Sequence, residues 1–195
     1  MKRFVFLLLG LVVIFGAIIL YRLYQDSFPN PDNAVSEYIS RITKNSRGEI
    51  ENIAVVSTTP RDGNESELVL LFRASGKGVD IHIAGYAIVK KSLFGWYVEK
   101  LQMFSKSPLP DDMMVNLDWS DGSQVIYGQV FLANASSVEA ILSDPNKGQV
   151  TVSAKIPVGN FVLFGSQYGE LFEFKILDSN GNVLKQLTKD ELQNG

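Results

Sequence analysis

The sequence predicts an N-terminal transmembrane helix, then an α+β domain with one helix on an antiparallel sheet, and then a small all-β sandwich. Three observations carry this prediction. Residues 4–21 form an uncharged apolar run, residues 35–42 carry an apolar stripe of helical period, and many later segments alternate apolar with polar side chains. We expect the anchor to cover 1–26, the α+β domain 27–106 and the sandwich 107–195.

The apolar run at 4–21 is long enough to cross a bilayer as a helix. About 18 residues at 1.5 Å rise cover roughly 27 Å, close to the thickness of the hydrocarbon layer. Tyr21 and Tyr24 fall where interfacial aromatic residues are expected, and no small-x-small cleavage site follows, so we interpret the run as an uncleaved anchor. Lys2 and Arg3 precede it and place the N-terminus in the cytoplasm and the C-terminal region outside.

A proline-containing linker at residues 28–32 separates the anchor from a predicted amphipathic helix. We expect Asp32 or Asn33 to cap this helix and residues 46–48 to end it. Its apolar stripe is predicted to pack on the following sheet, and a partner-binding helix is the alternative. Turn-like connections then join four strands of an antiparallel meander. The predicted strands are residues 51–57, 68–73, 79–90 and 96–104.

Residues 105–112 contain two prolines and no periodicity, so they mark the expected boundary between the two blocks of strands. Asp178-Ser179-Asn180-Gly181 is the clearest hairpin turn of the second block, because Asn-Gly accepts positive φ at both turn positions. Short strands with frequent turns are typical of a small sandwich. The predicted strands are residues 125–132, 138–142, 150–156, 161–164, 171–177 and 183–187.

Charge and composition exclude several classes of function. The net charge is -3 and the basic residues are scattered, so the chain lacks the basic stripe that nucleic acid requires. The absence of cysteine excludes disulfides, thiolate zinc sites, cysteine nucleophiles and a lipoprotein anchor. With a single histidine, His82, a histidine-based metal cluster is impossible. We therefore expect no cofactor and no metal.

Candidate catalytic residues are few. His82 with Asp80 as its orienting carboxylate is the only route to a serine–histidine–aspartate triad, and no Gly-x-Ser-x-Gly elbow accompanies it. A lone histidine on the mixed face of a strand is more often a plain surface residue. Acidic pairs at 111–112 and at 118 and 121 have the wrong spacing for a calcium loop, and Asp121-Gly122 is more simply a turn. We predict that the protein is not an enzyme.

Two aromatic segments are candidate interaction patches. The first lies among the glycines at 159–169, and the alternative is that its phenylalanines fill the sandwich core. The second is basic and aromatic, at a predicted hairpin end, where it could touch lipid headgroups or a wall polymer. The candidate residues are Phe161, Phe164 and Tyr168 in the first segment and Lys90, Lys91, Phe94 and Trp96 in the second.

The overall layout resembles uncharacterised single-pass membrane proteins of Gram-positive bacteria. The resemblance rests on Met1-Lys2-Arg3 before an apolar helix, the lack of cysteine, and a β-rich exported region ending in Asp-x-Asn-Gly. It covers the layout of the whole chain, implies a location rather than an activity, and transfers no functional residue.

We therefore expect a non-catalytic, membrane-anchored extracytoplasmic binding or scaffold module, an accessory subunit of an envelope complex. Its expected partners are the membrane, through residues 4–21, and an envelope protein or cell-wall polymer. An anchored module searches for its partner only in the membrane plane, which raises its effective concentration. Two alternatives stay open: a carboxylate-dependent envelope enzyme acting on polysaccharide, and a ligand-sensing domain.

Overall fold

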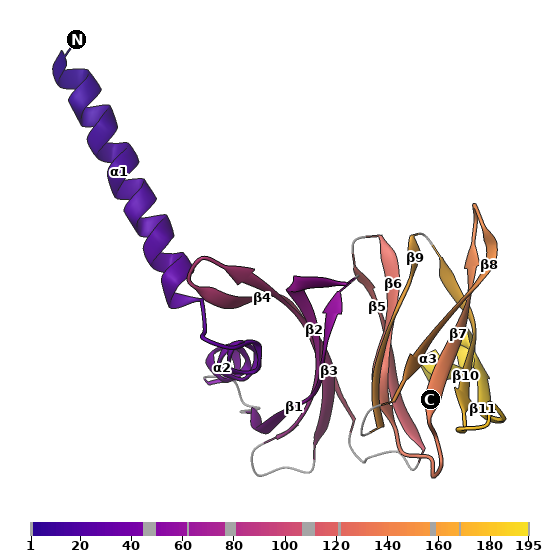
Figure 1. Cartoon of the computed structure of the whole chain (residues 1–195). Helices are drawn as coiled ribbons and strands as arrows, with labels where there is room; N and C mark the ends of the chain where they lie inside the picture. Colours follow the sequence, from indigo (N-terminus) through magenta and orange to yellow (C-terminus); the bar gives the residue numbers. More distant parts are fainter. Residues whose placement is uncertain are drawn as a thin grey trace.

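A computed structural model describes residues 2–44, 50–61, 63–76, 81–106, 112–120, 122–156, 159–167 and 169–194, without the side chains of residues 2–11, 22, 23, 106, 166, 167, 193 and 194. The described chain is mostly β (Figure 1). The helices are α1 (Lys2–Gln25), α2 (Pro31–Thr43) and α3 (Lys189–Asn194). The strands are β1 (Ile50–Arg61), β2 (Asn64–Gly76), β3 (His82–Ser92), β4 (Gly95–Lys106), β5 (Met113–Ser120), β6 (Ser123–Val130), β7 (Ser137–Asp144), β8 (Gly148–Lys155), β9 (Asn160–Gln167), β10 (Glu170–Leu177) and β11 (Val183–Thr188).

Helix α1 covers the apolar run predicted from the sequence and projects away from the β-sheets (Figure 1). Within the residues that the structure describes, no helix is long and apolar enough to cross a membrane.

Helix α2 begins two residues earlier than a cap at Asp32 would place it. The cap is Asn30, whose side-chain oxygen accepts a hydrogen bond from the Asn33 backbone N–H at 2.7 Å. Pro31 takes the first helical position, where its missing N–H costs nothing, so the prediction of Asp32 or Asn33 as the cap was wrong. The predicted end of this helix at 46–48 lies outside the described residues.

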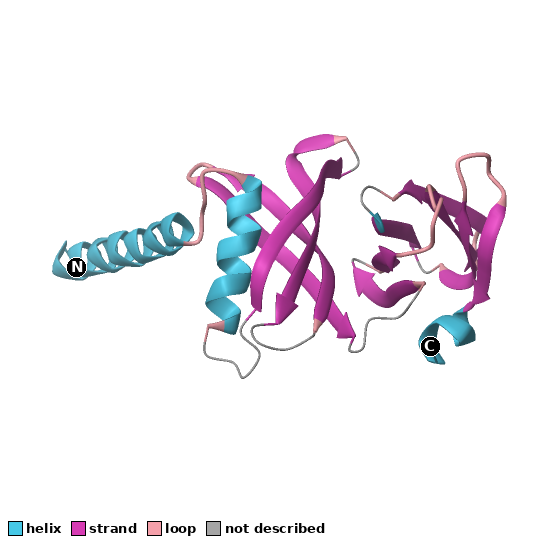
Figure 2. Cartoon of the chain, turned by 90° about the horizontal axis from the view of Figure 1, so that it is seen from below, coloured by secondary structure: helices cyan, strands magenta, loops and turns pink. Residues whose placement is uncertain are grey.

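Strands β1 to β4 form sheet A, an antiparallel meander in the order β1-β2-β3-β4, which confirms the predicted topology. Helix α2 lies across one face of it (Figure 2). The stripe residues Val35 and Ile39 are fully buried there against Leu70, Phe72 and partners from β3. The helix therefore packs on the sheet as predicted, but Tyr38 and Ile42 of the predicted stripe are 38% and 49% exposed, and Ala34 and Thr43 are buried instead.

The second block contains two further antiparallel sheets. Sheet B has the order β5-β6-β9 and sheet C the order β11-β10-β7-β8. Their facing sides share one core, in which the rings of Phe161 from β9 and Phe174 from β10 lie 5.5 Å apart. Strand β5 was not predicted from the sequence, which placed the first strand of this block at 125–132.

The predicted turn at 178–181 joins β10 to β11, with Leu177 paired to Val183. Only Gly181 has a positive φ, 84°, so the expectation of positive φ at both Asn180 and Gly181 was wrong. The Asp178 carboxylate holds the loop instead, accepting backbone hydrogen bonds from Asn180 and Asn182, both at 2.8 Å.

Sheets A and B pack face to face, an interface that we call the seam. The Tyr86 ring from sheet A meets the Tyr127 ring from sheet B edge to face at 4.9 Å, and both side chains are buried. Phe104 and Phe164 complete the aromatic cluster. The molecule is thus a stack of α2, sheet A, sheet B and sheet C (Figures 1 and 2). The division into domains at residue 107 stays a prediction.

Candidate functional site

The end of α1 is fastened to the β3–β4 hairpin, which carries the second predicted interaction patch. Phe28, just after the helix, pairs with Trp96 through two backbone hydrogen bonds of 2.7 and 2.8 Å. The ring of Tyr24 meets the ring of Phe94 edge to face at 6.1 Å. Two segments about 70 residues apart in sequence thus form one surface, the junction surface: Tyr21, Tyr24, Lys91, Leu93 and Phe94.

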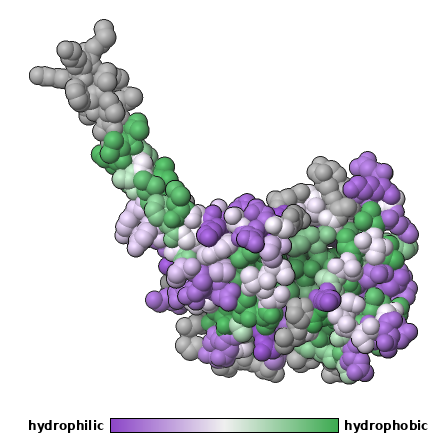
Figure 3. Space-filling view, viewed as in Figure 1, coloured by the Kyte–Doolittle hydropathy of each residue, from purple (hydrophilic) through white to green (hydrophobic). Residues whose placement is uncertain are grey.

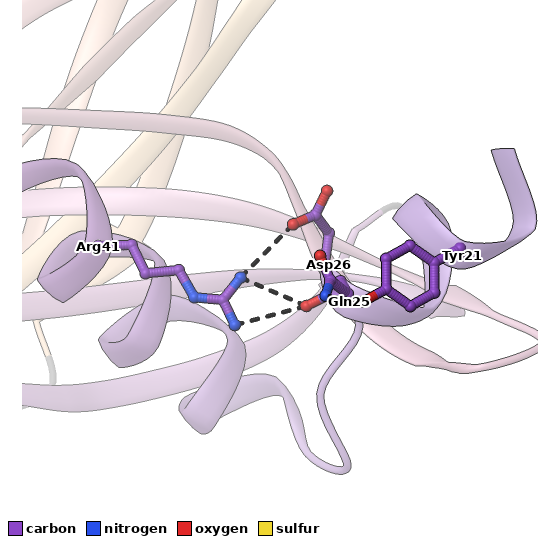
Figure 4. Close-up of polar contacts among 4 residues, drawn as sticks. All are labelled: Tyr21, Gln25, Asp26 and Arg41. Atoms are coloured by element: carbon purple, nitrogen blue, oxygen red, sulfur yellow. Dashed lines mark hydrogen bonds and ion pairs between the residues drawn. The ribbon is translucent and has the colours of Figure 1, made fainter. Parts of the chain in front are cut away.

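An arginine from α2 contacts the C-terminal end of α1. The Arg41 guanidinium donates to the Gln25 backbone oxygen at 3.3 Å and lies 3.4 Å from the Asp26 carboxylate (Figure 4). It also stacks over the Phe28 ring at 5.0 Å. Because Arg41 donates to the carbonyl oxygen of Gln25, the last residue of α1, it satisfies one of the acceptors that a helix end leaves open.

The junction surface is apolar at its tip and basic at its side. Leu93 is 97% exposed and Phe94 is 40% exposed, at the turn of the hairpin. The Lys91 ammonium lies over the Trp96 ring at 5.8 Å. Apolar side chains cover the described part of α1 above this surface (Figure 3). Exposed aromatic and apolar groups beside a lysine are typical of residues at a membrane–water interface.

Lys90, also predicted in this patch, is engaged elsewhere. Its ammonium lies 2.6 Å from a Glu99 carboxylate oxygen and 3.6 Å from Glu67. The hydrogen bond with Glu99 raises the pKa of Lys90 above its usual range. Lys90 is therefore part of a local ion-pair network and not a free cation for an external partner.

The first predicted patch does not form one exposed surface. Phe161 is fully buried in the core between sheets B and C, which fits the alternative interpretation that it fills that core. Phe164 is half-buried in the seam, with the Arg61 guanidinium 5.5 Å over its ring. Tyr168 lies outside the described residues. Neighbouring residues on β9 face opposite sheets, which separates these phenylalanines.

His82 lines a cavity of about 290 Å³ at one end of the seam, together with Asn52, Arg73, Ser75 and Gln129. Its suspected partner Asp80 lies outside the described residues. Sequence analysis missed the other polar residues of this cavity because they come from different strands. The one sequence pattern that pointed to these residues was the alternation of apolar and polar side chains. It places polar side chains at the ends of strand faces that are otherwise apolar.

Of the acidic residues considered earlier, Asp112 and Asp118 are held by local partners, and Asp111 and Asp121 lie outside the described residues. The Asp118 carboxylate lies 3.2 Å from the Lys100 ammonium and accepts a hydrogen bond from the Tyr86 hydroxyl at 3.2 Å. Burial and the Asp118 charge raise the pKa of Tyr86 well above its usual range. Asp112 accepts a hydrogen bond from Lys185, which lowers the pKa of that carboxyl. Among the residues that the structure describes, no group of three or more His, Asp or Glu side chains is placed to hold a metal.

Comparisons with known proteins give no relative. No family model, no curated protein and no solved structure matches this chain.

Proposed function

We propose that the chain is a non-catalytic binding module that α1 anchors in a membrane, with the sheets on the extracytoplasmic side and the junction surface resting on the bilayer. The proposal is supported most directly by the junction surface. Its exposed tyrosines, the 97% exposed Leu93 and the Lys91 ammonium gather where the apolar helix meets the sheets.

The anchoring half of the proposal draws on both sequence and structure. Residues 4–21 carry no charge, and they lie within the 24 residues of α1. Val12, Val13 and Phe15 are each more than 60% exposed, so the sheets do not cover these three apolar side chains of the helix. Lipid would cover these side chains, and the helix satisfies its own backbone hydrogen bonds.

The orientation and the partner follow from charge and layout. Lys2 and Arg3 precede the run, which favours a cytoplasmic N-terminus. The stack of three sheets then faces an envelope protein or a cell-wall polymer. The fixed hairpin contact would hold the stack at one angle to the bilayer, as an accessory subunit of a membrane complex requires.

Each alternative function was expected to bring a particular feature, and the described residues differ from both expectations. An enzyme with a carboxylic acid as proton donor needs a raised carboxyl pKa, whereas the resolved shifts among the described carboxyl groups, at Asp112, Asp178 and Glu191, are all downward. A ligand-sensing domain was expected to have an apolar pocket between α2 and sheet A. Val35 and Ile39 fill that interface, and the apolar cavity of about 290 Å³ beside Ile50, Ile83 and Met103 lies on the same face of sheet A with no α2 residue among its described lining.

Site-directed labelling tests the junction surface, because a chain without cysteine accepts a single introduced thiol. Leu93→Cys carries a polarity-sensitive fluorophore in vesicles, and Ser179→Cys, in the exposed β10–β11 turn, is the matched control. We expect spin-labelled lipid to quench the fluorophore at residue 93 and not the one at residue 179. Equal quenching at the two positions, or none at either, would contradict the proposal.

The binding half is tested by crosslinking in native membranes, comparing the full chain with residues 1–26 alone. A defined partner recovered only with the full chain supports the binding module. A full chain that stays monomeric and dispersed, with no partner, contradicts it.

A further inference from the structure

The side chains in the seam between sheets A and B change from apolar to polar toward one end. On β2, Val69 and Leu71 face sheet B and are followed on the same face by Arg73 and Ser75. On β3, Tyr86 shares its face with His82. The middle of the seam is therefore filled by apolar and aromatic side chains, while one end is lined by polar ones.

Sheet B contributes to the same polar end. Val125 and Tyr127 of β6 pack in the seam, and the next residue on that face, Gln129, is buried. Its side-chain amide donates to the Asn160 side-chain oxygen at 2.8 Å, which holds Gln129 in place. The cavity of about 290 Å³ opens between these facing strands, near the lower size limit of small-molecule sites.

A bulge in β1 brings a further polar side chain to the cavity. The pairing of β1 with β2 shifts register between Glu51 and Ala54, and Asn52 within that interval has a positive φ of 53°. Asparagine tolerates this conformation better than most residues. The Asn52 amide donates to the Ser75 hydroxyl at 3.0 Å, so both groups are fixed at the cavity wall.

Arg73 supplies the positive charge of the cavity. Its side chain is exposed at the mouth, and no hydrogen bond or ion pair joins it to another residue that the structure describes. The planar guanidinium can bind a carboxylate through two parallel hydrogen bonds. Ile83 and the half-exposed Phe131 give the cavity an apolar wall beside this charge.

We propose that the cavity between Arg73, His82 and Gln129 binds a small organic anion, with one carboxylate on the Arg73 guanidinium and a compact apolar body against Phe131. This inference rests on the proposed function and adds a small-molecule ligand to the binding module. The cavity lies at the opposite end of β3 from the junction surface, roughly 33 Å away for ten steps of 3.3 Å. It therefore faces away from the bilayer in the proposed orientation.

The single histidine provides a direct reporter, because ring-labelled histidine gives one NMR signal from the full chain in detergent. Sodium benzoate is titrated at constant pH and ionic strength, with benzyl alcohol as the uncharged control. We expect benzoate to shift the His82 signal saturably and benzyl alcohol to leave it unchanged. No saturable shift, equal shifts from both compounds, or equally tight binding of inorganic phosphate would overturn the proposal.

Substitutions at Arg73 and Phe131 then test whether these side chains contact the bound anion. Arg73→Met should weaken benzoate binding by roughly tenfold or more, because a charge-assisted hydrogen bond is lost, whereas Lys147→Met, in the exposed β7–β8 turn, should not change it. Phe131→Ala should weaken benzoate more than acetate. Unchanged benzoate affinity in Arg73→Met would overturn the proposal. All of this is measured in detergent, so a failed anchor and a failed site are distinguishable.

Discussion

Replacing Phe161 by alanine tests whether this side chain lies in the core or on the surface. Phe161 is 0% exposed and packs on Phe174, whereas Phe172, on the other side of β10, is 57% exposed. Truncating a buried phenylalanine costs about 3–5 kcal/mol, the lost transfer free energy plus that of the cavity left behind. Truncating an exposed one costs no more than about 0.5 kcal/mol.

Urea unfolding of the full chain in mild detergent, followed by circular dichroism, measures this difference. With a slope of about 2 kcal/mol per molar urea, Phe161→Ala should lower the unfolding midpoint by about 1.5–2.5 M. Phe172→Ala, the matched control, should stay within about 0.3 M of the unmodified chain. Similar midpoints for the two variants would refute the placement of Phe161 in the core between sheets B and C.

Three further predictions concern the seam and its surroundings. Tyr86→Phe should cost about 1–2 kcal/mol by removing the hydrogen bond to Asp118, and the loss should shrink in an Asp118→Ala background; an equal loss in both backgrounds would show that the two groups do not interact. Because Lys185 lowers the folded-state pKa of Asp112, the stability from this pair is present above the unfolded pKa, about 4, and is lost as the pH falls through the folded value. Acid should therefore reduce the urea midpoint of the unmodified chain more than that of Lys185→Met, and parallel curves would contradict this. Gly128→Ala would place a Cβ on the backbone of β5, so it should destabilise the chain by several kcal/mol, and an unchanged midpoint would contradict the close approach of β5 and β6.

Local patterns were sufficient for most of the fold. Apolar runs and apolar–polar alternation predicted ten of the eleven strands, and the helical stripe predicted that α2 packs on sheet A. Strand β5 was missed although its residues alternate, because Asp118 was considered with Asp121 as an acidic pair and Asp121-Gly122 as a turn. Its seam-facing polar residues are Asn116 and Asp118. Both have partners that only the folded chain supplies: Asn116 donates to the Tyr127 hydroxyl at 2.8 Å, and Asp118 accepts from Tyr86.

The candidate sites were harder to predict from the sequence. The segment around Phe94 was recognised, but its contact with Tyr24 joins positions far apart in the chain and depends on how α1 leaves sheet A. Alternation placed Tyr86 and His82 on one strand face. It could not show that sheet B covers that face, nor that a bulge brings Asn52 to the end of the seam.

Protease treatment of intact cells stripped of their wall, with an epitope at the C-terminus, tests membrane anchoring and orientation most directly. The account predicts that the protein sediments with membranes, resists alkaline extraction and loses its C-terminal epitope to protease added outside. An epitope that is digested only after lysis, or a chain released from membranes by alkali, would contradict it.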